Sequence, residues 1–127
     1  MAATNQFVQG YPTQFGNKIA ASFDRAGSSS YTQYNASTGA GDIFNASDVG
    51  LGGFDKVGAT FSGYTLSGTY IVQVKLTKAN DCGPGAAAKR VTLQWFTTSA
   101  AFGAISTEVS GATDLSAETI RLDYIGI

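Results

Sequence analysis

The chain has 127 residues and a formal net charge of −1, and 13% of its residues are charged, against about 25% in an average soluble domain. This length fits one domain that buries roughly two-thirds of its unfolded surface. The eight basic residues are dispersed, which argues against a nucleic-acid interface, and no apolar run approaches the length of a membrane span. The polar start predicts no secretory leader, and the single cysteine, Cys82, excludes an intrachain disulfide.

The chain is expected to begin with an extended arm, Met1–Asn17, followed by one β domain over residues 18–127. Three aromatic residues are spaced four apart through the arm: Phe7, Tyr11 and Phe15. Glycine and proline residues between them interrupt any helix. Two interpretations of the aromatic residues stay open, because they could pack on their own domain or reach a neighbouring subunit.

Alternation predicts the first strand of the domain, with Ile19, Ala21 and Phe23 facing inward and the polar residues Lys18, Ser22 and Asp24 facing outward. Several shorter elements are expected after it. They are an edge strand at Tyr31–Tyr34, a single helical turn at Asn45–Asp48, a strand at Val57–Phe61 and another short strand that includes Tyr64 and Leu66.

The clearest strand pair lies at Thr69–Thr98. In the first run, Tyr70 and every second residue after it are apolar, and Ile71 is the one apolar residue on the polar face. In the second run, Val91, Leu93 and Trp95 share one face. The turn-rich link Lys78–Lys89 predicts that the two strands are antiparallel neighbours, with Trp95 in the core.

Two more strands are expected near the end of the chain, at Ile105–Val109 and Thr119–Ile127, with a possible helical turn at Asp114–Glu118 between them. In the last strand the apolar residues Ile120, Leu122 and Tyr124 face inward. Seven or eight short strands without a long helix predict an all-β fold. We expect a single-domain β-sandwich of jelly-roll type, because each strand has one apolar face to bury.

Several kinds of chemistry find little support in the sequence. The chain has no histidine, which argues against most acid–base catalysis, catalytic triads and zinc sites. Cys82 has no obvious base beside it, and the acidic residues fall mostly in turn-like stretches. We therefore expect no enzyme and no cofactor, and a calcium ion held by distant loop oxygens stays an open possibility.

Aromatic residues in a polar segment suggest one binding site of a different kind. Tyr31 and Tyr34 lie three residues apart and are the best candidates for an exposed platform on which a sugar stacks. A carbohydrate- or receptor-binding β-sandwich, such as a fibre tip, is therefore one alternative function.

The whole chain resembles small virion proteins of tailed bacteriophages, in the style of head decoration, or cement, proteins. The resemblance is carried by the polar start Met1–Gln6, the low charge, the Gly, Ala, Ser and Thr bias, the all-β pattern and the terminal strand Thr119–Ile127. It implies a jelly-roll or related β domain that forms homotrimers on the capsid surface. Such a protein would be made in the host cytoplasm and would bridge subunits of the major capsid protein without an active site, nucleic acid or membrane. A phage tail or baseplate subunit is a further alternative.

Overall fold

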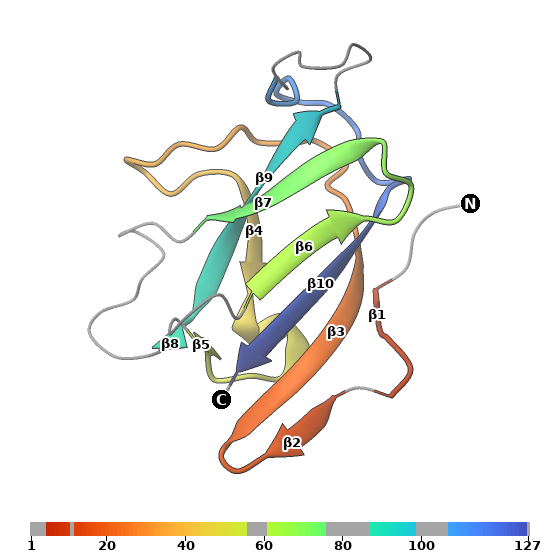
Figure 1. Ribbon diagram of the computed structural model, residues 1–127. Helices are drawn as coiled ribbons and strands as arrows, with labels where there is room; N and C mark the ends of the chain where they lie inside the picture. The colour runs from red at the N-terminus through yellow and green to blue at the C-terminus, as the bar shows by residue number, and fades with distance from the viewer. Residues whose placement is uncertain (1–4, 11, 56–60, 76–86, 99–106, 127) are drawn as a thin grey trace.

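The computed structural model describes residues 5–10, 12–55, 61–75, 87–98 and 107–126. These residues form ten strands and one 3-10 turn, arranged as two antiparallel sheets (Figure 1). The expected all-β class is therefore confirmed. No helix in the described part of the chain is long and apolar enough to cross a membrane.

The larger sheet is built on its two longest strands, β3 (Lys18–Ala26) and β10 (Thr119–Gly126), which pair over their whole length. Shorter strands extend this pair on both sides. On the outer edge of β3 lie β1 (Gln6–Phe7) and β2 (Thr13–Phe15); beside β10 lie β6 (Phe61–Thr65) and β5 (Phe54–Asp55), with β8 (Ala87–Ala88) beyond β5.

The smaller sheet has β9 (Arg90–Thr97) at its centre, between β4 (Asp42–Asn45) and β7 (Tyr70–Lys75). The predicted antiparallel pairing of the Thr69–Thr98 strands is confirmed, and Val72 lies opposite Trp95. The link between these strands lies mostly outside the described residues. Alternating β-branched and aromatic side chains explain the pairing, since they fit a pleated surface with one buried face.

The core lies between the two sheets and is rich in aromatic side chains. Trp95 is fully buried, as predicted, and the inward face of the last strand is confirmed by the burial of Ile120, Leu122 and Tyr124. The Phe44 ring from β4 packs on Phe54 with the ring centres 5.4 Å apart. Aromatic contacts of this kind join the sheets because each large ring reaches residues on the opposite layer.

The outer face of β3 is less exposed than the alternation predicts. Ser22 and Asp24 were expected to face solvent, yet both are buried. The Ser22 hydroxyl donates a hydrogen bond to Asp123, and Asp24 accepts two from Arg121, both partners being on β10. Cross-strand polar partners therefore cover this face, a contact that the pattern of a single strand does not reveal.

The described part of Met1–Asn17 lies along β3. Gln6 pairs with Asp24, and Thr13 pairs with Ala20, so β1 and β2 are edge strands of the larger sheet. A tight turn at Gly16 and Asn17 joins β2 to β3, and Gly16 has a φ of 59°, which suits glycine. The predicted boundary after Asn17 falls in this turn.

Other short elements differ from the sequence-based expectations. Tyr31–Tyr34 is a loop, not an edge strand, because its backbone bonds to the loop at residues 112–113. The expected turn at Asn45–Asp48 is found as the 3-10 turn η1 (Ala46–Val49), whereas Asp114–Glu118 contains turns without a helix. Residues 57–60 and 105–106 of two predicted strands lie outside the described residues. The described end of the second one contributes a single β-bridge, between Glu108 and Phe96.

We predict that Trp95→Ala lowers the free energy of unfolding by about 3–5 kcal/mol, because a large buried side chain is replaced by a cavity. Urea denaturation followed by circular dichroism measures the loss. The exposed residue Gln73 on β7 offers a control, and Gln73→Ala is expected to change stability by less than about 0.5 kcal/mol. A loss below roughly 1 kcal/mol for Trp95→Ala would contradict its place in the core.

Candidate functional site

A polar connection crosses the core between the two sheets. It centres on Asp42 at the start of β4, whose side chain is 3% exposed. One carboxylate oxygen accepts a hydrogen bond from Nη2 of Arg25 on β3 at 2.8 Å, and the other accepts one from Nε1 of Trp95 on β9 at 3.0 Å. The buried charge is thereby paired and hydrogen-bonded, which is the condition for burying a carboxylate at tolerable cost.

A second set of hydrogen bonds leads from the same tryptophan to the loops at one end of the sheets. The Trp95 backbone N–H donates to the Tyr31 hydroxyl oxygen at 3.0 Å, and that hydroxyl donates to Oε2 of Glu108 at 2.9 Å. The Tyr34 N–H donates to the same Glu108 oxygen at 2.7 Å. Burial raises the pKa of Tyr31 well above its ordinary value; the Trp95 N–H opposes this shift, and the hydrogen bond to Glu108 adds to it.

The outer face of the larger sheet carries its own ion pair. Arg121 on β10 donates from Nε and Nη2 to the two carboxylate oxygens of Asp24, at 2.8 and 3.0 Å. The hydrogen bonds that Arg121 donates to Asp24 raise the pKa of Arg121, so the guanidinium stays charged at every pH of interest. In this bidentate geometry both carboxylate oxygens of Asp24 are bonded to Arg121, so the two charges neutralise each other.

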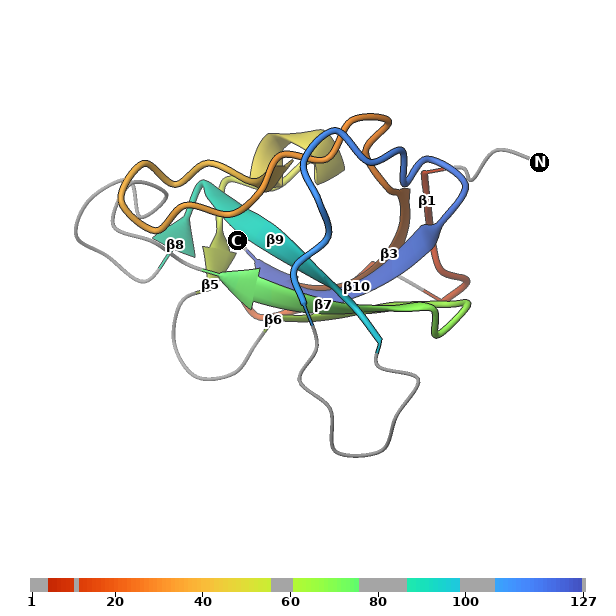
Figure 2. The same cartoon turned by 90° about the horizontal axis from the view of Figure 1, so that it is seen from above.

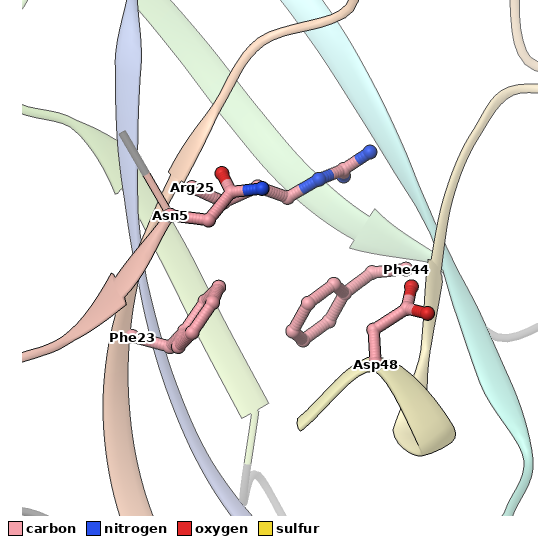
Figure 3. Close-up of a pocket in the computed structure, with 5 residues that line it drawn as sticks. All are labelled: Asn5, Phe23, Arg25, Phe44 and Asp48. Carbon is pink, nitrogen blue, oxygen red and sulfur yellow. The ribbon is translucent and has the colours of Figure 1, made fainter. Parts of the chain in front are cut away.

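A cavity of about 260 Å³ lies beside the seam between β3 and β4 (Figure 3). Its lining residues come from both sheets and from the segments next to them: Asn5, Phe23, Arg25, Phe44 and Asp48. The Arg25 guanidinium carbon lies 5.7 Å from the centre of the Phe44 ring. Its Nη1 atom is buried with no hydrogen-bond partner in the described part of the chain, so the aromatic face replaces a second acceptor.

The chemistry available in this cavity is limited. Asp48 is the one carboxylate in the lining, and Arg25 is already paired with Asp42. Acid–base hydrolysis of a glycoside needs two carboxyl groups, and nucleophilic catalysis needs an activated nucleophile. The five lining residues supply neither combination. Among the described residues, no cluster of three or more acidic, Cys or His side chains is placed to hold a metal ion.

The predicted partner-binding aromatics are only partly described. The Phe7 side chain is 38% exposed and packs edge-on against Phe23, with ring centres 5.1 Å apart. Tyr11 lies outside the described residues, and Phe15 is placed in β2 without a described side chain. Phe7 therefore combines an anchoring contact with free apolar surface at the edge of the larger sheet. Cys82 also lies outside the described residues.

The predicted sugar platform is not present in the expected form. Tyr31 is 2% exposed and its hydroxyl is held between Trp95 and Glu108, so its ring is not available on the surface. Tyr34 is half-buried, and the Lys75 ammonium lies 5.8 Å from its ring centre. The two rings do not form an exposed pair, because the segment folds back onto the core at Tyr31. The spacing of the two tyrosines in the sequence does not reveal this.

The inter-sheet connection was missed by reasoning from the sequence, although a signal for it exists. Arg25 continues the inward alternation of Ile19, Ala21 and Phe23, and Asp42 has the same parity as the buried Phe44. Opposite charges at inward positions of two strands indicate a buried pair. Their partnership requires knowing that β3 and β4 face each other.

The comparisons with known proteins give no relative. No family model matches the sequence, and no curated protein and no solved structure matches it.

We predict that the folded protein resists alkaline ionisation at two of its six tyrosines. Burial raises the pKa of both Tyr31 and Tyr124 above the ordinary value of 10.0. Above that pH the unfolded chain loses protons that the folded chain keeps, so the free energy of unfolding falls as pH rises. Urea denaturation at a series of alkaline pH values measures this fall, and tyrosinate absorbance follows the ionisation.

Two variants separate this effect from a general alkaline loss of stability. Tyr31→Phe removes one buried phenol and should make the alkaline fall shallower, although the variant is less stable at neutral pH. Tyr124→Phe removes the other buried phenol and should also make the fall shallower, whereas a general alkaline loss of stability would be unaffected by either change. Ionisation of all six tyrosines near the ordinary pKa in a chain that remains folded would contradict the prediction.

Proposed function

We propose that the protein decorates and stabilises the capsid of a tailed bacteriophage. In this proposal it is made in the host cytoplasm and binds on the capsid surface between subunits of the major capsid protein. It acts as a homotrimer, without catalysis, a cofactor or a nucleic-acid partner. A cement protein works by mass action, because binding only to the assembled lattice shifts the equilibrium away from disassembly.

The observation that carries this proposal is the edge position of Phe7. The β1 and β2 strands cover the outer side of β3, and β1 presents a large apolar side chain that is anchored on Phe23 yet remains 38% exposed. Apolar side chains at a strand edge are suited to contact another protein. We infer that the segment Met1–Asn17 meets the capsid through Phe7, Tyr11 and Phe15.

The finer description of the fold belongs to the same proposal. Two antiparallel sheets around an aromatic core are compatible with a β-sandwich, and we propose the jelly-roll connection pattern that decoration proteins often use. Threefold symmetry would place three copies of the Met1–Asn17 segment around one axis and thereby multiply weak contacts. The proposed extended arm is the segment Met1–Asn17, whose described part pairs along the edge of β3.

The sugar-binding alternative loses support from the burial of Tyr31, which removes one of its two stacking rings from the surface. The tail or baseplate alternative differs from capsid decoration in the assembly that it predicts. A hexamer in solution would favour a tail ring, whereas a trimer fits decoration or a fibre tip.

We predict that Phe7→Ser weakens capsid binding at least tenfold, because it removes the exposed apolar contact at the sheet edge. The purified protein is mixed with shells assembled from the major capsid protein of the phage that encodes it, and binding is measured by cosedimentation. Deleting Met1–Asn17 is a less clean test, since it strips β1 and β2 from β3 and so also destabilises the domain.

The neighbouring residue provides the matched control. Gln6 is exposed on the same short strand, so Gln6→Ser should bind like the wild type. Thermal unfolding of each variant shows whether the domain is intact. A wild-type protein that stays in the supernatant with intact shells would overturn the proposed function, and wild-type occupancy by Phe7→Ser would overturn the role of the edge.

A further inference from the structure

The strands β1 and β2 lie one after the other along the same edge of β3, but they do not form one continuous strand. Gln6 pairs with Asp24, and Thr13 pairs with Ala20. Between these two pairs the N-terminal segment advances by seven residues and β3 by four, so three residues of the segment have no position opposite β3. Extra residues in one strand of an antiparallel pair form a β-bulge, which disrupts the strand locally.

These two strands form one end of the larger sheet. In the described part of the chain no strand lies beyond them, and both views show β1 as the outermost strand beside β3 (Figures 1 and 2). An outermost strand presents backbone N–H and C=O groups that can pair with a strand of another molecule. Residues 5–15 contain no Lys, Arg, Asp or Glu, so this edge lacks the charged side chains that commonly prevent such pairing.

One hydrogen bond fixes which backbone groups of β1 and β2 point outward. The Val8 N–H donates to the Ser22 carbonyl oxygen at 2.8 Å. Because the direction of these bonds alternates along a strand, the even-numbered residues of β3 face β1 and β2. The N–H groups of Phe7 and Gln14 lie opposite odd-numbered residues of β3 and therefore point away from the sheet. Outward groups of this kind are the ones that a further strand would use.

The extra residues keep these outward groups out of one regular row. Gln9 and Gly10 form a turn, and the φ of Gly10 is 91°, which is far from the extended geometry of a strand. Pro12, just before β2, has no backbone N–H to donate. A strand from another molecule would therefore meet β1 or β2 separately, and each of them is at most three residues long.

We infer that the interruption between β1 and β2 prevents the edge of the larger sheet from pairing with a strand of another molecule. It takes the place of the charged side chains that this edge lacks. The inference goes beyond the proposed function and does not depend on it, because it concerns a contact that the edge excludes. The exposed Phe7 side chain stays available at this edge for contacts that do not use the backbone.

Deleting residues 10–12 tests the inference, because it removes the interruption alone. Both registers are kept, since Gln9 then falls opposite Ala21 and joins Val8 directly to Thr13. The outward N–H groups now recur at every second position of one continuous strand. Two copies are expected to pair edge to edge about a twofold axis, so size-exclusion chromatography with light scattering should give about twice the wild-type mass.

Deleting residues 9–11 instead provides the matched control. This deletion removes the same number of residues and keeps the same registers, but it puts Pro12 opposite Ala21 in the middle of the new strand. An N–H at that position would point outward, so proline costs no bond to β3 and removes a donor that a second copy needs. This variant should keep the wild-type mass.

Hydrogen exchange measured by nuclear magnetic resonance shows whether association uses the backbone of this edge. The Phe7 and Gln14 N–H groups should be protected in the associated 10–12 deletion variant and unprotected in the control and in the wild type. Circular dichroism confirms that each variant is folded. A folded 10–12 deletion variant with the wild-type mass, or equal association of both variants, would overturn the inference. Protection of these two N–H groups in the wild type would also overturn it, whether or not the variants fold.

Discussion

The buried carboxylate of Asp42 is the constraint on which the arrangement of the two sheets depends. It joins β3 through Arg25 and β9 through the Trp95 indole, so three strands from both layers converge on one charged group. Apolar side chains alone permit two layers to slide, because the hydrophobic effect has no direction. Hydrogen bonds with fixed geometry prevent such sliding. Removing one partner of a buried ion pair costs about 3–5 kcal/mol. The pair therefore fixes how the layers meet.

Trp95 also connects the core to the loops at one end of the molecule through hydrogen bonds. Its backbone N–H holds the Tyr31 hydroxyl, which in turn holds Glu108, and Glu108 also accepts the Tyr34 N–H. The loop at Tyr31–Tyr34 is thereby tied to the core by hydrogen bonds as well as by the buried Tyr31 ring. The Tyr31 hydroxyl and the Glu108 carboxylate are therefore engaged in hydrogen bonds within the protein.

The larger sheet ends in different strands on its two sides, and Figure 1 shows β1 and β6 on either side of the β3–β10 pair. Phe7 is exposed on the β1 side, and Tyr64, Leu66 and Ile71 are exposed where β6 and β7 meet. The proposed capsid contact uses the Phe7 side alone. The low overall charge suits contact with neutral protein surfaces, because few ionised groups lose their hydration when such surfaces meet.

The sequence by itself determined the all-β class, the β7–β9 pairing and the inward faces of β9 and β10, because alternation reports burial wherever a strand has one apolar face. It also marked Ile71 as an apolar residue on an outward face. Only the tertiary structure decided that Tyr31 is buried, that Arg25 and Asp42 meet across the core, and that Ser22 and Asp24 are covered by β10. Each of these depends on which strand lies beside which. Such contacts join residues far apart in the chain, and local periodicity marks an inward position without identifying its partner.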